Sequence, residues 1–255
     1  MRRSIIKKIS NYDLIIIFIF TLIIAAVFVA RSFYSLRNLS SILKLSTLVG
    51  IAALGECMVI ITKGIDISVG AVMGITSVIS AMIIEPLGVV AAIIIPLFAC
   101  GIIGFINGLI IVKGRIPALV TTIGMMWTLR GIASILTSGR PIRITNENMT
   151  VLANASIFKV IPYFFIGLVV ASLILHLILN NLKIGKHIFA IGGNEDAAYY
   201  SGLNIDKTRI FVYMFAAIFY GIAGLFMASY IRVGSHSLAG GYEFRAITAV
   251  AFAGV

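Results

Sequence analysis

The chain has 255 residues, of which 60% are hydrophobic and only 11% are charged, and its mean hydropathy is +1.11. Soluble globular domains carry about 25% charged residues, so this composition excludes an ordinary soluble domain. Twenty basic residues against nine acidic ones give a net charge of +11. Because the basic residues are scattered between hydrophobic runs, the charge indicates membrane topology and not nucleic-acid binding.

Seven hydrophobic runs are candidates for membrane-spanning helices, because a hydrocarbon core about 30 Å thick needs roughly 20 apolar residues per helix. They cover residues 14–30, 42–61, 69–84, 89–112, 116–136, 161–182 and 210–231. The third run is short, and we expect its helix to be tilted little or broken. An eighth run starts at Ala246 and reaches only Val255, so we expect the sequence to stop inside a helix. The sequence predicts an all-α, polytopic transmembrane helix bundle that forms one domain over residues 1–255.

The basic residues also predict an orientation. Four precede the first run, and an excess of Lys and Arg marks the cytoplasmic side, so we expect a cytoplasmic N-terminus. Alternating loops then place eleven bases inside: Arg2, Arg3, Lys7, Lys8, Lys63, Lys113, Arg115, Lys183, Lys186, Lys207 and Arg209. Eight fall outside: Arg31, Arg37, Lys44, Arg140, Arg143, Lys159, Arg232 and Arg245. A cleaved signal peptide is the alternative for the first run, but the run is long for one and further spans follow.

Small residues recur at four-residue spacing inside the runs, which lets helix backbones approach closely in lipid and predicts a tightly packed bundle. The pairs are Gly70 with Gly74, Gly104 with Gly108, Ala217 with Gly221, and Gly224 with Ala228. The sequence shows no convincing internal repeat.

No motif for intrinsic catalysis is present in the sequence. The chain lacks the Gly-rich loop that ends in Gly-Lys-Ser/Thr and cradles ATP phosphates, since Gly185-Lys186 has neither the upstream glycine nor the following hydroxyl. The two cysteines, Cys57 and Cys100, lie in hydrophobic runs, and the three histidines are far apart in sequence. We therefore expect no catalytic residue, no metal site and no bound cofactor, and any ATP and Mg would be held by a partner ATPase.

The most informative polar stretch is the predicted cytoplasmic loop 183–209. Asn194 is a good N-cap, Glu195 and Asp196 add negative charge to a first helical turn, and Gly202 can end the helix in the left-handed conformation. A short helix over residues 195–201 is expected.

Such a short helix is marginal in water and needs a surface to pack against. In one interpretation Tyr199 and Tyr200 anchor it at the lipid interface. In the other it is a coupling helix that docks into an ATPase. The capping residues alone favour neither.

Three further residues are candidates for a translocation path or a gate. Glu56 and Arg130 lie within predicted spans, where ionisable groups are costly and face the bundle interior or a wet cavity. They either pair structurally or line a path for polar solute. Asp66 lies where one span ends and the next begins, so it is either an N-cap or part of a gate.

An ordered series of motifs resembles the permeases of monosaccharide ABC importers, the ribose, xylose, galactose and autoinducer-2 group, with ribose-type members nearest. The motifs are Thr62-Lys63-Gly64-Ile65-Asp66-Ile67-Ser68-Val69-Gly70, Ile116-Pro117-Ala118, Thr122-Ile123-Gly124, Leu129-Arg130-Gly131, Thr137-Ser138-Gly139-Arg140-Pro141, Ile191-Gly192-Gly193-Asn194-Glu195-Asp196-Ala197-Ala198, Ser201-Gly202 and Gly241-Tyr242-Glu243. Together they extend over nearly the whole chain.

This resemblance implies a dimeric permease core with a second permease subunit, an extracytoplasmic sugar-binding protein, and a cytoplasmic ATPase with two nucleotide-binding domains. It also implies that the coupling helix to the ATPase consists of Asn194, Glu195, Asp196, Ala197, Ala198, Tyr199, Tyr200, Ser201 and Gly202. Glu243 of the last motif joins Glu56, Asp66 and Arg130 as a candidate for the path or its gate.

The expected function is that of a permease subunit that moves a small, ribose-like sugar across the bacterial cytoplasmic (inner) membrane. A branched-chain amino-acid or nucleoside ABC permease is the alternative within the same class. An ion-coupled secondary transporter would need a relay of membrane carboxylates, for which only Glu56 clearly qualifies. A non-transporting membrane anchor would explain the spans but not the capped polar helix.

Overall fold

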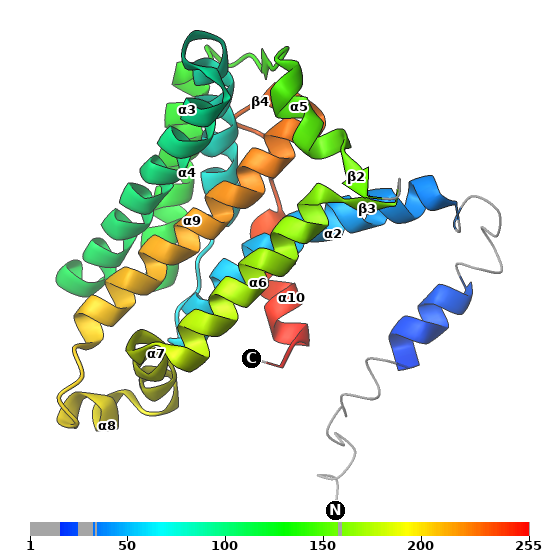
Figure 1. The fold of residues 1–255 in the computed structure, drawn as a ribbon. Helices are drawn as coiled ribbons and strands as arrows, with labels where there is room; N and C mark the ends of the chain where they lie inside the picture. The colour runs from blue at the N-terminus through cyan, green and yellow to red at the C-terminus, as the bar shows by residue number, and fades with distance from the viewer. Residues whose placement is uncertain (1–15, 25–32, 34, 158–159, 255) are drawn as a thin grey trace, which may run out of the picture.

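The computed structural model describes residues 16–24, 33, 35–157 and 160–254, and most of these are helical. The helices are α2 (Leu36–Ile61), α3 (Val69–Gly114), α4 (Ala118–Leu136), α5 (Glu147–Asn154), α6 (Tyr163–Asn181), α7 (Lys183–Gly193), α8 (Glu195–Tyr200), α9 (Ile205–Ile231) and α10 (Tyr242–Phe252) (Figure 1). Residues 16–24 are helical as well. Four two-residue strands form two antiparallel pairs, β1 (Ile142–Arg143) with β4 (Val233–Gly234) and β2 (Ser156–Ile157) with β3 (Ile161–Pro162).

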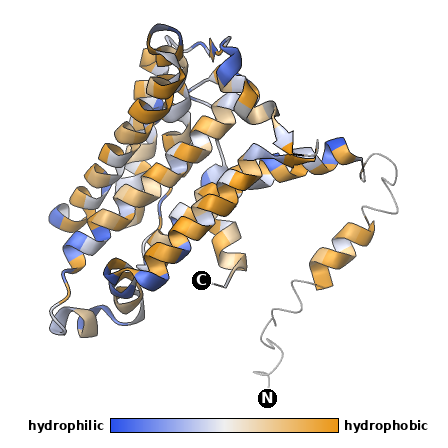
Figure 2. Ribbon diagram, in the orientation of Figure 1, coloured by the Kyte–Doolittle hydropathy of each residue, from blue (hydrophilic) through white to orange (hydrophobic). Residues whose placement is uncertain are grey.

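Five helices in the described part of the chain are long and apolar enough to cross a membrane: α2, α3, α4, α6 and α9. Figure 2 shows hydrophobic residues along most of their length, with hydrophilic residues gathered at the ends of several helices and in α7. The prediction of an all-α, multi-pass membrane protein is therefore confirmed. The predicted first run, 14–30, lies partly outside the described residues, as do the N-terminal basic residues.

The predicted third and fourth runs form the two arms of α3. The helix is interrupted at Gly88, whose φ of 80° and ψ of 175° are non-helical, two residues after Pro86. Because Gly64 and Arg115, just before and just after α3, line the same cavity, the two arms run in opposite directions. The interruption falls between the third and fourth runs and not within the third run, 69–84, whose helix is continuous. Glycine supplies the backbone angles that the turn requires.

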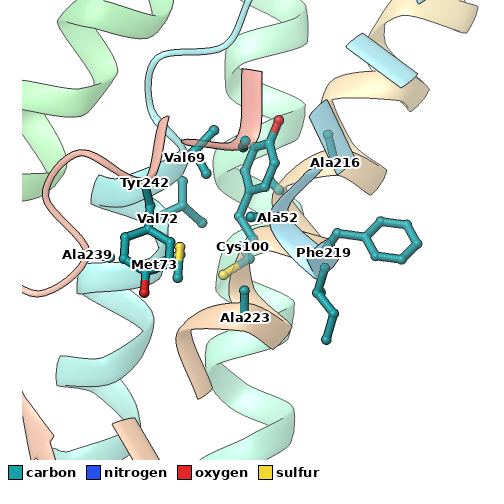
Figure 3. Packing of buried hydrophobic residues seen from close by; sticks show 14 of the residues in the cluster. Ala52, Val69, Val72, Met73, Cys100, Ala216, Phe219, Ala223, Ala239 and Tyr242 are labelled. Carbon is teal, nitrogen blue, oxygen red and sulfur yellow. The ribbon is translucent and has the colours of Figure 1, made fainter. Parts of the chain in front are cut away.

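Helix α9 lies at the centre of the bundle and packs along α3 and α2. Figure 3 shows Val72 and Met73 of α3 beside Tyr242, with Ala216 and Ala223 of α9 nearby. The predicted small residues form this contact: Gly104 faces the backbone of Tyr213 and the side chain of Ala217, and Gly224 faces the backbone of Met73. Close backbone approach therefore holds α3 against α9, as expected for helices that associate in lipid.

Two long helices are each followed by a partly buried non-helical segment and a second helix. The connector, residues 62–68, joins α2 to α3, and the return segment, residues 232–241, joins α9 to α10. Helix α9 packs on α3, and α2 packs on α10. Thr62, after α2, and Arg209, near the start of α9, line one cavity, so α2 and α9 run in opposite directions.

Several boundaries differ from the predicted runs. Helix α2 starts at Leu36 instead of residue 42, because Ser35 caps it by accepting a hydrogen bond from the Asn38 N–H at 3.2 Å. Helix α9 starts at Ile205 instead of residue 210, with Asn204 as its cap. Helix α10 starts four residues before Ala246. In each case polar first-turn residues hid the true start from a search for apolar runs.

Adding one methyl group at Gly104 should destabilise the fold. The new Cβ would lie 2.7 Å from the Cβ of Ala217 and closer still to the Tyr213 carbonyl oxygen. Gly101, one turn away, is the matched control, because a Cβ there would meet only Ile218 at 3.7 Å. We expect Gly104→Ala to lower the stability by about 1–3 kcal/mol and Gly101→Ala to leave it unchanged or raised. Thermal unfolding of the solubilised protein, followed by size-exclusion chromatography, measures both, and equal effects would contradict the packing argument.

Candidate functional site

The first part of the candidate site is a buried polar cluster around the connector 62–68. Glu56 of α2 is fully buried. Its Oε1 accepts a hydrogen bond from the Asp66 N–H at 3.1 Å, and its Oε2 accepts one from the Tyr220 hydroxyl of α9 at 2.7 Å. Glu56 therefore joins α2, the connector and α9. It does not pair with Arg130, whose ion-pair partner is Glu243.

Asp66 and Ser68 continue this cluster within the connector. Asp66 Oδ1 accepts hydrogen bonds from both the N–H and the hydroxyl of Ser68, at 2.7 and 2.6 Å. Asn107 Nδ2, on the second arm of α3, reaches the Ser68 hydroxyl at 3.4 Å. The N-cap position of α3 belongs to Ser68, so the interpretation of Asp66 as that cap is wrong.

Helix α4 binds the connector through Thr122. The Thr122 hydroxyl oxygen accepts a hydrogen bond from the Ile67 N–H at 3.1 Å, and the hydroxyl lies 3.4 Å from the Ile65 carbonyl oxygen. Three successive N–H groups of the connector, those of residues 66 to 68, are thus bound by side-chain oxygens. Irregular backbone inside a membrane bundle requires such partners, because lipid offers none.

The second part of the site lies where the return segment meets the start of α3. Glu243, in the first turn of α10, is 4% exposed. Its Oε1 lies 3.7 Å from Arg130 Nη2 of α4, whereas its Oε2 is buried and has no hydrogen-bond partner among the described residues. Gly70 leaves room here, since a Cβ at that position would meet Glu243 Oε2 and the Ala239 carbonyl oxygen. Arg130 and Glu243 therefore form one long ion pair beside the start of α3.

The third part is the polar stretch 183–209, which is mostly helical. Asn194 caps α8 by accepting a hydrogen bond from the Ala197 N–H at 3.0 Å, and Gly202 follows with a φ of 80°. Both capping predictions are confirmed, and the helix ends at Tyr200 with Ser201 as its C-cap. Glu195 Oε2 accepts a hydrogen bond from Arg209 Nη2 at 2.7 Å, which fastens α8 to α9.

Helix α7, which precedes α8, corrects the expectation of a loop before Asn194. Its buried face consists of Gly185, Ile188 and Ile191. The three-residue spacing of the isoleucines is typical of an amphipathic helix and could have predicted α7. The neighbouring glycines, which disfavour helices, made the stretch resemble a loop. Gly192 packs against the carbonyl oxygen of Ile61, the last residue of α2. The segment that carries α8 is thus in direct contact with the end of α2 and the connector.

The outward surface of α8 is aromatic. Tyr199 is 67% and Tyr200 is 86% exposed, and their rings meet edge to face at a centroid distance of 5.6 Å. A cavity of about 730 Å³ lies beside them, lined in part by Gly202, Asn204 and Arg209. Ala198 faces inward and is buried, while Asp196 and Ala197 are exposed. Helix α8 therefore presents a rigid, capped aromatic surface.

The structure unites the predicted residues into three groups: Glu56 with Asp66, Arg130 with Glu243, and the α8 residues. Sequence reasoning missed the partners that complete these groups, namely Ser68, Asn107, Thr122, Arg209 and Tyr220. Each is a polar residue in or next to an apolar run, which is the signal that could have identified it. Among the described residues no cluster of three or more His, Cys, Asp or Glu side chains could hold a metal, and both cysteines are free.

This architecture is that of a multi-pass helical membrane protein in which two non-helical segments, the connector and the return segment, lie beside buried polar groups. Non-helical backbone at membrane depth is tolerated where it is buried in protein or lines a cavity. A family profile described as "Branched-chain amino acid transport system / permease component" matches residues 38–255. The chain belongs to this family of transport permeases.

Individual relatives agree with this assignment. The ribose import permease of Escherichia coli K12 is 31% identical over 88% of this chain and 71% of its own length. The ribose import permease of Bacillus subtilis is 32% identical over 92% of this chain and 74% of its own length. The galactose/methyl galactoside import permease of Haemophilus influenzae is 31% identical over 99% of this chain and 82% of its own length. No solved structure matches the chain significantly.

The buried tyrosines of α9 provide a test of the polar cluster. Tyr220→Phe removes the hydrogen bond to Glu56, and we expect a loss of about 1–3 kcal/mol, since it leaves a buried carboxyl oxygen unpaired. Tyr213→Phe is the matched control, because the Tyr213 hydroxyl is equally buried and makes no hydrogen bond within the described residues. Its thermal midpoint should match or exceed that of the wild type. A Tyr213→Phe loss as large as that of Tyr220→Phe would show that removal of a buried hydroxyl, and not the lost hydrogen bond to Glu56, causes the destabilisation.

Proposed function

We propose that this chain is the membrane-spanning permease subunit of an ATP-driven ABC importer for a small sugar of the ribose type. The observation that carries the proposal is the capped aromatic helix α8, which is exposed to a partner on one side and fastened to the transmembrane bundle on the other. The relatives named above are import permeases for ribose and galactose, which supports the sugar. ATP and Mg would be held by a separate ATPase, since the chain has no phosphate-binding loop.

In the proposed topology the N-terminus, α7 and α8 face the cytoplasm of a bacterial inner membrane, and the chain crosses the membrane seven times before α10. The two arms of α3 count as two spans in this scheme. The ends of α2, α3 and α6 and the start of α9 then lie on the α8 side and bring Lys63, Lys113, Arg115, Lys183, Lys186, Lys207 and Arg209 together there. This follows the positive-inside rule.

The proposed assembly has two permease subunits, an ATPase with two nucleotide-binding domains and an extracytoplasmic sugar-binding protein. Movement of the ATPase would act on residues 194–202 and reach the bundle by two physical links. One is the ion pair between Glu195 and Arg209, which leads into α9. The other is the contact of Gly192 with Ile61, which leads into α2 and the connector.

The connector and the return segment are the proposed moving parts of the path. Their non-helical backbone is held by side chains of other helices, so a tilt of α2, α4 or α9 changes their hydrogen bonds directly. The Arg130–Glu243 pair is long, at 3.7 Å, and is therefore a candidate for a gate that opens and closes. The sugar need not be bound tightly here if a binding protein supplies the affinity.

A branched-chain amino acid is the second candidate substrate, because the matching family profile is described as a branched-chain amino acid permease component. Uptake measurements on the chain reconstituted with its ATPase and binding protein decide between them. We expect ATP-dependent accumulation of labelled ribose or galactose, insensitive to collapse of the proton and sodium gradients, and none of labelled leucine. Leucine uptake would overturn the sugar assignment. Uptake that persists without ATP would overturn the ABC class.

A charge exchange tests the link between α8 and α9. Glu195→Arg places two cations together, and we expect it to lower substrate-stimulated ATP hydrolysis of the reconstituted complex at least threefold, because close like charges repel. The double variant Glu195→Arg with Arg209→Glu restores an ion pair of opposite direction and should recover most of the stimulation. Equal expression and thermal stability of the three proteins is the control for folding. A double variant no better than the single one would remove the ion pair from the coupling route.

A further inference from the structure

A second cavity, of about 440 Å³, opens between the end of α2, the end of α3 and the start of α9. Three basic residues line it: Lys63 from the connector, Arg115 after α3, and Arg209 from α9. Asp206 is the one acidic residue of the lining. Pockets for small molecules measure about 300–1,000 Å³, so the volume suits a small ligand.

The lining carries a net charge of +2, from three cations and one anion. The neighbours outside the lining do not alter this sum, because Glu195 on Arg209 and Lys113 on Asp206 contribute opposite charges. Lys63 and Arg115 are exposed and make no ion pair with any acidic group that the structure describes. Two uncompensated cations therefore face a common space.

A simpler role for these bases is to offset the negative ends of helix dipoles. The C-terminal ends of α2 and α3 each carry only about half a negative charge. Two full positive charges exceed what the two helix ends require. Helix dipoles thus account for part of the positive charge and leave a surplus in the cavity.

The backbone explains how two of these bases reach the cavity. Lys63 has a φ of 61° and Arg115 a φ of 52°, the left-handed conformation in which many helices end. These caps place two basic residues at the ends of different helices beside one cavity.

We propose that this cavity binds a phosphate group, either of a free phosphate monoester or of an anionic lipid headgroup. A phosphate monoester carries a charge of about −1.5 to −2 at pH 7, which matches the cavity. Lys63 and Arg115 supply its cationic contacts, and the guanidinium of Arg209 adds a planar donor that suits phosphate oxygens. The inference rests on the proposed function only in placing this end of the molecule in the cytoplasm.

Binding in this cavity would affect the permease because Arg209 both lines the cavity and pairs with Glu195 of α8. The same guanidinium holds Glu195 of α8 at 2.7 Å. A phosphate in the cavity competes with Glu195 for Arg209 and thereby weakens the link between α8 and α9. Phosphorylated ligands would accordingly act on the coupling segment and not on the sugar path.

Binding of glucose 6-phosphate to the purified complex, in phosphatidylcholine nanodiscs without nucleotide, tests the site directly by isothermal titration calorimetry, with glucose as the uncharged control. We expect glucose 6-phosphate to bind and glucose not to bind. The double variant Lys63→Gln with Arg115→Gln should weaken binding at least tenfold. Lys183→Gln with Lys186→Gln is the matched control, because it removes the same charge from exposed positions of α7 outside the cavity. Its affinity should remain within twofold of the wild type.

Nanodiscs that also contain phosphatidylglycerol separate the two sources of phosphate. If a lipid headgroup occupies the cavity, phosphatidylglycerol displaces glucose 6-phosphate from the wild type and stabilises it thermally, and the Lys63/Arg115 variant loses that stabilisation. If the ligand is a free monoester, phosphatidylglycerol changes neither quantity. Equal weakening by the two double variants would overturn the site, as would a wild type that responds neither to glucose 6-phosphate nor to phosphatidylglycerol. Because neither measurement involves transport, failure here leaves the sugar-import proposal intact.

Discussion

The structure depends on how it satisfies non-helical backbone inside a bundle that lipid surrounds. The connector 62–68 presents N–H groups that no helix ladder can bind, and each unpaired group in an apolar interior costs on the order of several kcal/mol. Glu56, Asp66 and Thr122 bind three of them in succession. The polar residues of the spans are therefore explained first by this requirement, before any role in transport.

The same requirement links the parts of the molecule. Glu56 can bind the connector only because Tyr220 of α9 holds its other oxygen, and α9 is held at that distance by the small residues that face α3. A shift of α9 would consequently move Glu56 and, through it, change the hydrogen bond that Glu56 accepts from the connector. Packing and hydrogen bonding thus form one mechanical unit, which α7 contacts through Gly192 on Ile61 and α8 through Glu195 on Arg209.

The sequence predicted the membrane class, the helix runs and the caps of α8, because hydropathy and capping are local properties. It also separated the third and fourth runs where α3 is interrupted, although the backbone angles of Gly88 that turn the chain there are visible only in the structure. It did not show which polar residues meet. Glu56 and Tyr220 are 164 positions apart, and nothing local to either residue identifies the other.

The antiparallel packing of α2 and α9 brings these distant residues together. Each of these long helices leads through a partly buried non-helical segment into a second helix. The sequence Gly-Ile-Asp-Ile-Ser precedes one second helix and Leu-Ala-Gly-Gly precedes the other, so the two segments share no residue pattern that a sequence comparison would detect. They satisfy their backbones differently: Glu56, Asp66 and Thr122 bind N–H groups of the first segment, whereas the Ser77 hydroxyl accepts a hydrogen bond from the Ser235 N–H of the second at 3.1 Å. The bundle thus constrains the path of both segments and leaves open which side chains bind their backbones.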